Sequence, residues 1–423
     1  MIEFDTHTDD YPRTINVKWY RDATLLSDED FNVDNALYFC DEQVQAYNKI
    51  VITIGNMTKA DRHLKIYNIS DGITRQFYNE ELENVEIIEQ ITNNNNALNI
   101  NEASLVILPQ NTSGVLFQRT LPFSIYRNDV LYGRFFINSS TSNTNKTMYS
   151  LQVNDYISML EGQSYLGGLY NNVTASTLIA DILGDVPYTL DATLGAKTIS
   201  GFLPILNKRE ALREVAFCLN ALIDTSRSDE INIKPLPTTS SRTIAPSEIV
   251  NIETTQTNIT TKIELNTTML STRNASTDTI FSGNVSGTQT IVFDAPKFDL
   301  AISGGTILSS NINYAIISGS GAVTLTGKTY EQVEVLESKT NPYVVSTDIE
   351  KIESYSTTLT SSTPIINYLN FVEFKIKSNF LMSSTKVGDI VSLNGQICRV
   401  MSLNYNIWQT NIYCDAELEA YYE

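Results

Sequence analysis

Few side chains in this sequence could hold a metal ion or act in catalysis. The chain has two histidines, His7 and His63, and the first lies in the acidic run DTHTDD at residues 5–10. Carboxylates and an imidazole are metal-binding groups, and a Ser–His or Cys–His nucleophile pair would need one of these histidines. No GxSxG sequence accompanies them. We interpret the run as a solvated acidic segment and both histidines as surface or edge residues.

A second candidate metal site resembles a calcium-binding loop. Residues 30–41 begin with the spacing Asp30-x-Asn32-x-Asp34 and reach Asp41 at the twelfth position. Oxygen ligands at alternate positions are what a calcium loop supplies. The sixth residue, however, is Asn rather than the glycine that the sharp turn needs, and the twelfth is Asp rather than Glu. The sequence leaves calcium binding at this loop open, and we predict no catalytic, cofactor-binding or metal-binding residue for the chain.

Paired carboxylates, glycines and cysteines add no reactive site. The run EELE at residues 80–83 is expected in so acidic a chain and does not indicate a glycosidase pair. The glycines at 304–305 and 319–321 do not open a helix, which a phosphate site would require. The four cysteines have no metal-ligand spacing. Cys398 and Cys414 fall on predicted strands that could be neighbours, so a disulfide between them is left open, with reduced thiols as the default.

Composition limits the classes of partner. The chain has 423 residues, of which 42% are hydrophobic and 18% charged, and its net charge is −19. This length allows two to four domains with a sizeable core. The acidic balance, without any basic stripe, excludes a protein that reads nucleic-acid sequence. No signal peptide and no apolar run of membrane length is found, so we expect a chain made in the cytoplasm, with no membrane partner.

The element pattern is mostly that of short strands separated by turns. Alternating or apolar runs predict strands at 14–19, 50–54, 64–69, 85–91, 104–108, 123–126, 134–138, 148–155, 260–266, 290–293 and 314–317. A polar break falls at 93–96. Near the C-terminus, Gly388-Asp389 leads into an apolar strand and Asn394-Gly395 is a strong hairpin signal. Residues 319–329 are interpreted as one edge of a β-sandwich.

Helical signals concentrate in residues 166–237. Thr174 is placed to cap a short apolar helix that ends at Gly184. Asn207 and Glu210 have the spacing of a capping box at the start of a second helix. A predicted hairpin at 221–234 follows, and prolines end the unit. These signals predict a small α/β domain between two strand-rich regions.

Five segments of this domain and one near the C-terminus resemble tail hub proteins, the baseplate hubs of contractile-tailed bacteriophages and of phage-tail-like particles. They are LGGLY at 166–170, the capped helix at 177–183, ISGFLPI at 199–205, REALREVA at 209–216, DTSR at 224–227 and VGDIV at 387–391. The resemblance covers residues 100–237 and 370–423, about half of the chain.

The resemblance implies a mainly β (α+β) fold. Its parts would be an N-terminal β domain at 1–84, a tube-like antiparallel β-barrel at 85–165, a small α/β domain at 166–237, a second tube-like barrel at 238–260 and 361–423, and an outer β domain of β-sandwich type inserted at 261–360. Two barrels per subunit imply a homotrimer whose ring of six barrels adapts a sixfold tail tube to a threefold central spike.

The implied partners are the tail tube protein, the central spike and other baseplate proteins of the virion tail. An acidic lumen would let DNA pass without binding it specifically. Some relatives carry a cell-wall hydrolase segment or a C-terminal spike, and neither is seen in this sequence, so a separate polypeptide would supply cell-wall cleavage.

Two alternatives come from different classes of protein. A tail-tip adhesin or carbohydrate-binding protein is suggested by the Tyr- and Asn-rich strands of residues 1–90 and 260–360. A cell-wall hydrolase is disfavoured by the scarcity of histidine and by the lack of a nucleophile motif. The sequence decides neither between a contractile and a flexible tail, nor between a phage and a bacteriocin particle.

Overall fold

The computed structural model places most of the chain and assigns it to the mainly β class. The residues it describes are 2–5, 10–38, 40, 42, 44, 47–59, 63–69, 77–92, 97–109, 117, 122–128, 130–145, 147–255, 260–273, 276–344, 351–408 and 411–422. About 60% of the structure is strand and 11% is helical, which confirms the predicted fold class. The chain divides into two units, residues 1–78 and 79–423.

The first unit contains two small antiparallel sheets. One has the order β4-β1-β6 (Leu37–Tyr38, Ile2–Glu3, Asn68–Ile69), and the other has the order β3-β2-β5 (Thr24–Asn32, Thr14–Arg21, Lys49–Ile54). Alternate residues of β2 are buried and form a core with Phe4, as the period of a strand requires. The strand predicted at 64–69 is wrong in length, because β6 pairs only with the two-residue β1.

The second unit is built on one eleven-stranded sheet. Its first set of strands is a meander in the order β7-β8-β11-β10-β9. The bounds, which follow the short 3₁₀ helix η1 (Asn79–Glu81), are β7 (Leu82–Gln90), β8 (Glu102–Ile107), β9 (Pro122–Arg127), β10 (Val130–Ser142) and β11 (Tyr149–Asn154). Val85, Ile87, Leu105, Leu151 and Val153 alternate along these strands and are fully or almost fully buried, because one face of the sheet covers the core.

The second set of strands comes from the C-terminal part of the chain and from the segment after residue 239. Its order is β20-β28-β31-β30, and β29 and β19 continue from β30. The bounds are β19 (Ser240–Ile244), η3 (Pro246–Glu248), β20 (Ile249–Thr255), β28 (Val372–Leu381), β29 (Ile390–Leu393), β30 (Gln396–Asn406) and β31 (Tyr413–Tyr421). The predicted turn at Asn394-Gly395 is confirmed, since both residues have the positive φ that a type I′ hairpin needs.

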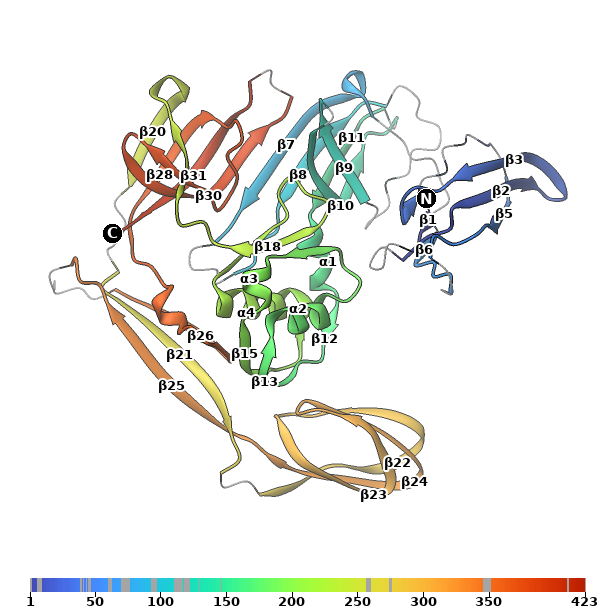
Figure 1. Cartoon of the computed structure of the whole chain (residues 1–423), viewed down its shortest axis with the longest axis vertical. Coiled ribbons are helices and arrows are strands. Elements are labelled where there is room, and N and C mark those ends of the chain that lie inside the picture. Colours follow the sequence, from blue (N-terminus) through green and yellow to red (C-terminus); the bar gives the residue numbers. More distant parts are fainter. Residues whose placement is uncertain are drawn as a thin grey trace. The chain divides into compact units, whose positions relative to one another are not determined.

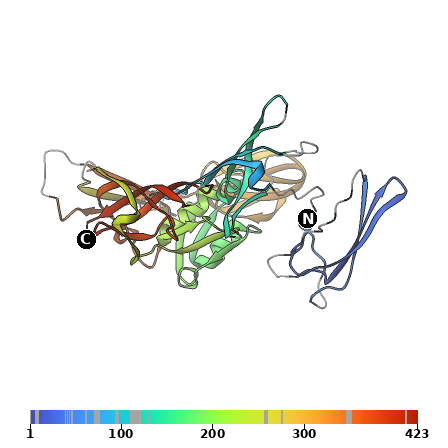
Figure 2. The same cartoon turned by 90° about the horizontal axis from the view of Figure 1, so that it is seen from above.

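Strand β30 joins the two sets into one sheet. One edge of β30 pairs with β31, while the other edge pairs first with β29, from Gln396 to Arg399, and then with β7, from Ser402 to Asn406. Figure 1 shows the two sets side by side, one in blue to teal and the other in orange to red, and they are again adjacent in the turned view of Figure 2. The two predicted barrels are not confirmed, because among the described strands β9, β19 and β20 each pair on one edge only, so neither set closes on itself.

The helices lie in the region between the two sets. In chain order the elements are α1 (Tyr156–Glu161), β12 (Ser164–Tyr165), β13 (Gly168–Thr174), α2 (Ala175–Leu183), β14 (Tyr188–Leu190), α3 (Ala192–Gly195), β15 (Thr198–Leu203), β16 (Leu206–Asn207), α4 (Lys208–Leu219), β17 (Ala221–Asp224) and β18 (Ile231–Pro235). The predicted caps are confirmed: Thr174 accepts from the Thr177 amide, Asn207 accepts from the Glu210 amide, and α2 ends at Gly184. No described helix is both long and apolar enough to cross a bilayer.

The segment after β20 forms an insertion on a long ribbon. Its elements are β21 (Lys262–Ser271), β22 (Thr277–Val292), β23 (Lys297–Ser310), β24 (Tyr314–Thr329), β25 (Glu331–Thr340), β26 (Ile352–Thr357), β27 (Leu359–Ser361) and η4 (Ile365–Asn367). The ribbon is the sheet β25-β21-β26, and β27 pairs with β15. Asn313 holds the insertion to the helical region, since its amide donates to the carbonyls of Leu166 and Leu203 over 2.8 and 2.9 Å.

The outer part of the insertion is a single three-stranded sheet in the order β22-β24-β23. The interpretation of 319–329 as a sheet edge is wrong, because β24 is the central strand and pairs on both sides. Ala315, Ile317, Val323 and Leu325 face one small core from the two ends of β24. Gly319 lies between them, where a Cβ would come within 2.7 Å of Val323 Cγ2. The sheet therefore bends at glycines and covers its own apolar face.

Candidate functional site

The residues of the two predicted metal-binding patterns do not form a described metal site. Asp5 is buried and lies 2.8 Å from the ammonium of Lys65, so its carboxylate is already paired with a cation. His7 lies outside the described residues, and His63 is exposed. Within the described part of the chain, no group of three His, Cys, Asp or Glu residues is arranged to hold a metal ion.

The loop-like calcium pattern falls on a strand. Asp30 and Asn32 belong to β3, where they pair with β2 in extended conformation, and Asp30 accepts a hydrogen bond from the Asn16 side chain over 3.0 Å. A calcium loop must instead wrap its alternate oxygens around one point. Asp41, the predicted twelfth position, lies outside the described residues, as does the polar break at 93–96.

Cys398 and Cys414 do not form a disulfide. Both thiols are free, although β30 and β31 are neighbours as predicted. Cys414 pairs with Tyr405 of β30, seven residues from Cys398, which separates the two by about 23 Å at ~3.3 Å per residue. A disulfide needs Cα atoms within about 7 Å. Burial raises the pKa of Cys398 to about 11 and that of Cys414 to about 12, so both are unreactive thiols at neutral pH.

The densest polar cluster surrounds the DTSR turn between β17 and β18. Asp224 is 2% exposed and accepts from the Ser226 amide over 2.9 Å and from the Lys234 ammonium over 2.7 Å. Arg227 has a left-handed φ of 53°, which reverses the chain and sends its side chain towards the large sheet. Its guanidinium donates to the Thr385 carbonyl over 2.7 Å. Every residue of this motif therefore fixes the helical region to the strands around it.

Arg227 also meets the junction of the two strand sets. Its Nε lies 3.4 Å from Glu89 Oε1 of β7, and its guanidinium lies 5.7 Å from the ring centre of Tyr405 of β30. The Tyr405 hydroxyl donates to the same Glu89 oxygen over 2.7 Å. Glu89 Oε2 has no hydrogen-bond partner among the described residues. One acidic group thus receives contacts from β30 and from the DTSR turn.

Burial sets the ionisation of this cluster. It raises the pKa of Glu89 above the usual carboxyl range, and the positive charge of Arg227 and the Tyr405 hydrogen bond act in the opposite direction. Burial alone would lower the pKa of Arg227, but Glu89 and Tyr405 outweigh it and the pKa rises. The arginine therefore stays charged, and its charge is what keeps a carboxylate tolerable at this depth.

A second buried network surrounds Asp155, the N-cap of α1. Its carboxylate accepts from the backbone amides of Asn101 and Ile157, each over 3.0 Å, and from the Thr225 hydroxyl. The Asn101 side chain in turn donates to Thr225 over 2.9 Å. Burial raises the pKa of Asp155 to about 6. This network connects the start of β8, the start of α1 and the DTSR turn.

The arrangement supports mechanical rather than chemical work. The buried carboxylates already accept hydrogen bonds or pair with cations, and the cluster has no thiol or hydroxyl held against a histidine, since the only described histidine is exposed. The sequence analysis quoted the DTSR turn as a motif but missed its partners Glu89, Tyr405 and Asp155. A buried acid within an apolar strand, such as Glu89 in VEIIEQI, was the available signal.

The outer strands of the large sheet carry exposed apolar side chains. At one end, Tyr126 of β9 and Val130 of β10 are 61% and 56% exposed, and at the other end Val250 of β20 is 67% exposed. Each of β9 and β20 pairs with a single described strand. Apolar groups beside an open sheet edge are typical of surfaces that another chain covers.

Comparison with known proteins finds likeness in structure but not in sequence. No family model matches the chain, and no curated protein matches it. A tail protein from Neisseria meningitidis MC58 is similar with a TM-score of 0.48, and the match covers 80% of this chain and 92% of that one. Prophage tail protein gp18 from Listeria monocytogenes EGD-e has a TM-score of 0.47, with 84% and 91% covered. Sequence identity is 8% in both.

A further match, at a TM-score of 0.37 and 8% identity, covers 81% of this chain and 74% of an E. coli protein. That protein is described as a component of the type VI secretion system with structural similarity to the T4 bacteriophage tail proteins gp27 and gp5. Since all these scores lie below 0.5, we base the functional argument on this chain's own strands and contacts. The structural neighbours of this chain are phage and prophage tail proteins and a secretion-system component, the kinds of protein consistent with the baseplate or tail hub family that its sequence motifs resemble.

Proposed function

We propose that the chain is a structural hub of a tail baseplate, that it does no chemistry, and that three copies form a ring. The observation that carries this proposal is the junction at β30, where two strand sets of one subunit lie side by side in one sheet. Three such subunits would present six strand sets around a threefold axis. That arrangement would match a sixfold tail tube on one face and a threefold central spike on the other.

The open ends of the sheet support ring formation. Val250 at one end and Tyr126 at the other are exposed apolar groups on opposite outer strands. Contact between the first end of one subunit and the second end of the next is heterologous, and such contacts close into rings when the rotation permits. The net charge of −19 supports a lumen through which DNA passes without being held.

The mass of the purified chain in solution tests this proposal. Light scattering should give a species of three times the 47.3 kDa chain, and negative-stain images should show a ring with a central opening. A particle that remains a monomer, both alone and after addition of the tail tube protein encoded beside it, would overturn the proposal. Clearing of a cell-wall zymogram by the pure chain would overturn its non-enzymatic part.

An adhesin at the tail tip is the second candidate function. The observation that favours it is the β22-β24-β23 sheet, which has a core of its own and exposes Val292 and Leu308. A self-contained module on a ribbon could present such side chains to a receptor. Saturable binding on a glycan array by a chain that forms no ring would favour this function over the hub.

A further inference from the structure

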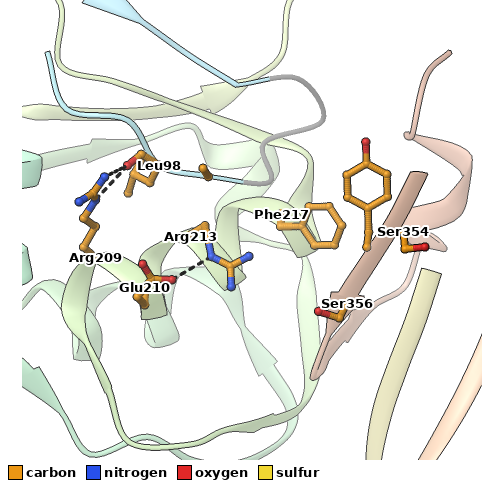
Figure 3. Close-up of a pocket in the computed structure, with 9 residues that line it drawn as sticks. Leu98, Arg209, Glu210, Arg213, Phe217, Ser354 and Ser356 are labelled. Atoms are coloured by element: carbon orange, nitrogen blue, oxygen red, sulfur yellow. Dashed lines mark hydrogen bonds and ion pairs between the residues drawn. The ribbon is translucent and has the colours of Figure 1, made fainter. Parts of the chain in front are cut away.

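A cavity of about 370 Å³ lies between helix α4 and strand β26, as Figure 3 shows. Arg209, Arg213 and Phe217 recur at every fourth residue of α4 and form one wall, because residues four apart share a face of a helix. Tyr355 of β26 stacks on Phe217 with ring centres 6.0 Å apart. This volume is within the range of ligand-binding sites in proteins, and the sequence analysis gave no sign of it.

The other wall of the cavity is the free edge of β26. Ser354, Tyr355 and Ser356 all line the cavity although consecutive residues of a strand point to opposite faces. Only an edge is reached from both faces. Strand β26 pairs with β21 on its other side, and no described strand pairs with this edge.

The hydrogen-bond parity of β26 identifies the main-chain groups that face the cavity. The Lys351 carbonyl accepts from the Thr261 amide over 2.9 Å, so residue 351 points its main chain towards β21. Since these directions alternate along a strand and the β21–β26 register has no shift, Ser354 and Ser356 direct their N–H and C=O groups away from β21. An open strand edge opposite a helix is the geometry in which an extended peptide adds as a further strand.

The charge of the walls selects the peptide. Two guanidinium groups and one carboxylate, that of Glu210, line the cavity. Arg209 uses Nε and Nη2 on the Leu98 carbonyl, and Arg213 uses Nε and Nη2 on Glu210 and Glu214. These contacts leave Nη1 of Arg213 for an incoming carboxylate, which an arginine binds with good geometry. In a chain of net charge −19, a wall with more cations than anions stands out.

We infer that this groove is a peptide-binding site, in which an extended acidic segment of another protein adds as a strand to β26 and places a carboxylate against Arg213. Main-chain hydrogen bonds to Ser354 and Ser356 supply affinity, and the arginines supply the preference for acidic side chains. This binding mode goes beyond the proposed tail function and does not depend on it.

Fluorescence anisotropy with defined peptides tests the inference on the full chain. The probe is fluorescein-labelled TVEVEVT, and the control peptide is TVKVKVT. The acidic probe should bind saturably and at least tenfold more tightly than the basic one. Ser354→Pro, which removes an outward N–H, should weaken binding at least tenfold. The matched control is Ser338→Pro on β25, the opposite edge of the same sheet, where the parity set by Asn341 also points the N–H outward, and it should bind as the wild type does.

A second measurement needs no variant protein. Two further probes carry N-methyl groups on alternate main-chain nitrogens, one set on the odd and the other on the even positions. Since only one edge of an added strand faces β26, one probe should lose binding at least tenfold and the other should keep it. Equal loss from both probes, equal binding of acidic and basic peptides, or no saturable binding would overturn the inference. Self-association of the chain that Ser354→Pro abolishes would replace the peptide by a second copy and overturn it too.

Discussion

Tyr405 of β30 donates a 2.7 Å hydrogen bond to Glu89 of β7, although 316 residues separate the two in the chain. This bond lies at the point where the two strand sets of the large sheet meet. Arg227 approaches the same carboxylate oxygen from the DTSR turn. The contact therefore couples three segments that are distant in sequence, and it is the natural place to test how the sheet is held together.

Replacing Arg227 by methionine should destabilise the chain strongly. The change leaves the buried carboxylate of Glu89 without its cation, and breaking a buried ion pair costs about 3–5 kcal/mol. The urea midpoint of the variant should fall accordingly. The matched control is Lys377→Met, whose partner Glu417 is 60% exposed and whose loss should cost under about 1 kcal/mol. Equal midpoints for the two variants would contradict the role given to Arg227.

The stability of the second unit should depend on pH through Asp155. Its folded pKa is about 6, against an ordinary value of 3.8, so the folded state binds this proton more tightly than the unfolded state does. The stabilisation is present below about pH 4 and is lost as the pH rises towards 6, by at most about 3 kcal/mol at ~1.4 kcal/mol per unit.

Urea midpoints of the wild type and of Asp155→Asn, measured from pH 4 to 7, isolate this effect. Glu89 and Glu214, whose pKa values burial also raises, are present in both chains, so their contributions cancel in the difference. The difference between the two curves should change by pH 6 and then level off. A constant difference across the range would show that Asp155 titrates normally.

Alanine at Gly201 should be costly. The residue lies in the GFLP motif on β15 with a φ of 125°, and a Cβ there would come 2.1 Å from the Thr358 carbonyl oxygen. Strain of this kind costs about 1–3 kcal/mol. Gly162→Ala is the control, because nothing lies within 4 Å of its Cβ position. Thermal unfolding should show a lower midpoint for the first variant alone, and a neutral Gly201→Ala would refute the close approach of the two strands.

Glutamate at Val250 should weaken ring formation without unfolding the chain. The side chain is 67% exposed on an outer strand, so its replacement disturbs a contact between subunits rather than a core. We expect at least tenfold weaker self-association in sedimentation velocity. Val333→Glu on β25, an exposed position of the insertion, should leave association unchanged. If both variants associate like the wild type, the β20 end of the sheet is not an interface.

Local signals predicted local structure well. Asn207 with Glu210, Thr174 with Gly184, and Asn394-Gly395 each specify a cap or a turn through groups a few residues apart, and the structure has all of them. The partners of a strand edge are not encoded in this way. Nothing near β30 announces that its second half pairs with β7, so two separate barrels were expected where one sheet is found. The same limit produced the open disulfide at Cys398 and hid the groove beside β26.

The branched pairing of β30 has a consequence for synthesis. Strand β7 emerges from the ribosome early, but its partner follows more than 300 residues later, so β7 must keep that edge unpaired until translation is nearly complete. Native contacts of such long sequence separation fold slowly and leave edges open to wrong partners meanwhile. The joined sheet thus acts as a completion check: a chain truncated before residue 396 would lack the strand that unites the halves, and would be left out of any ordered assembly.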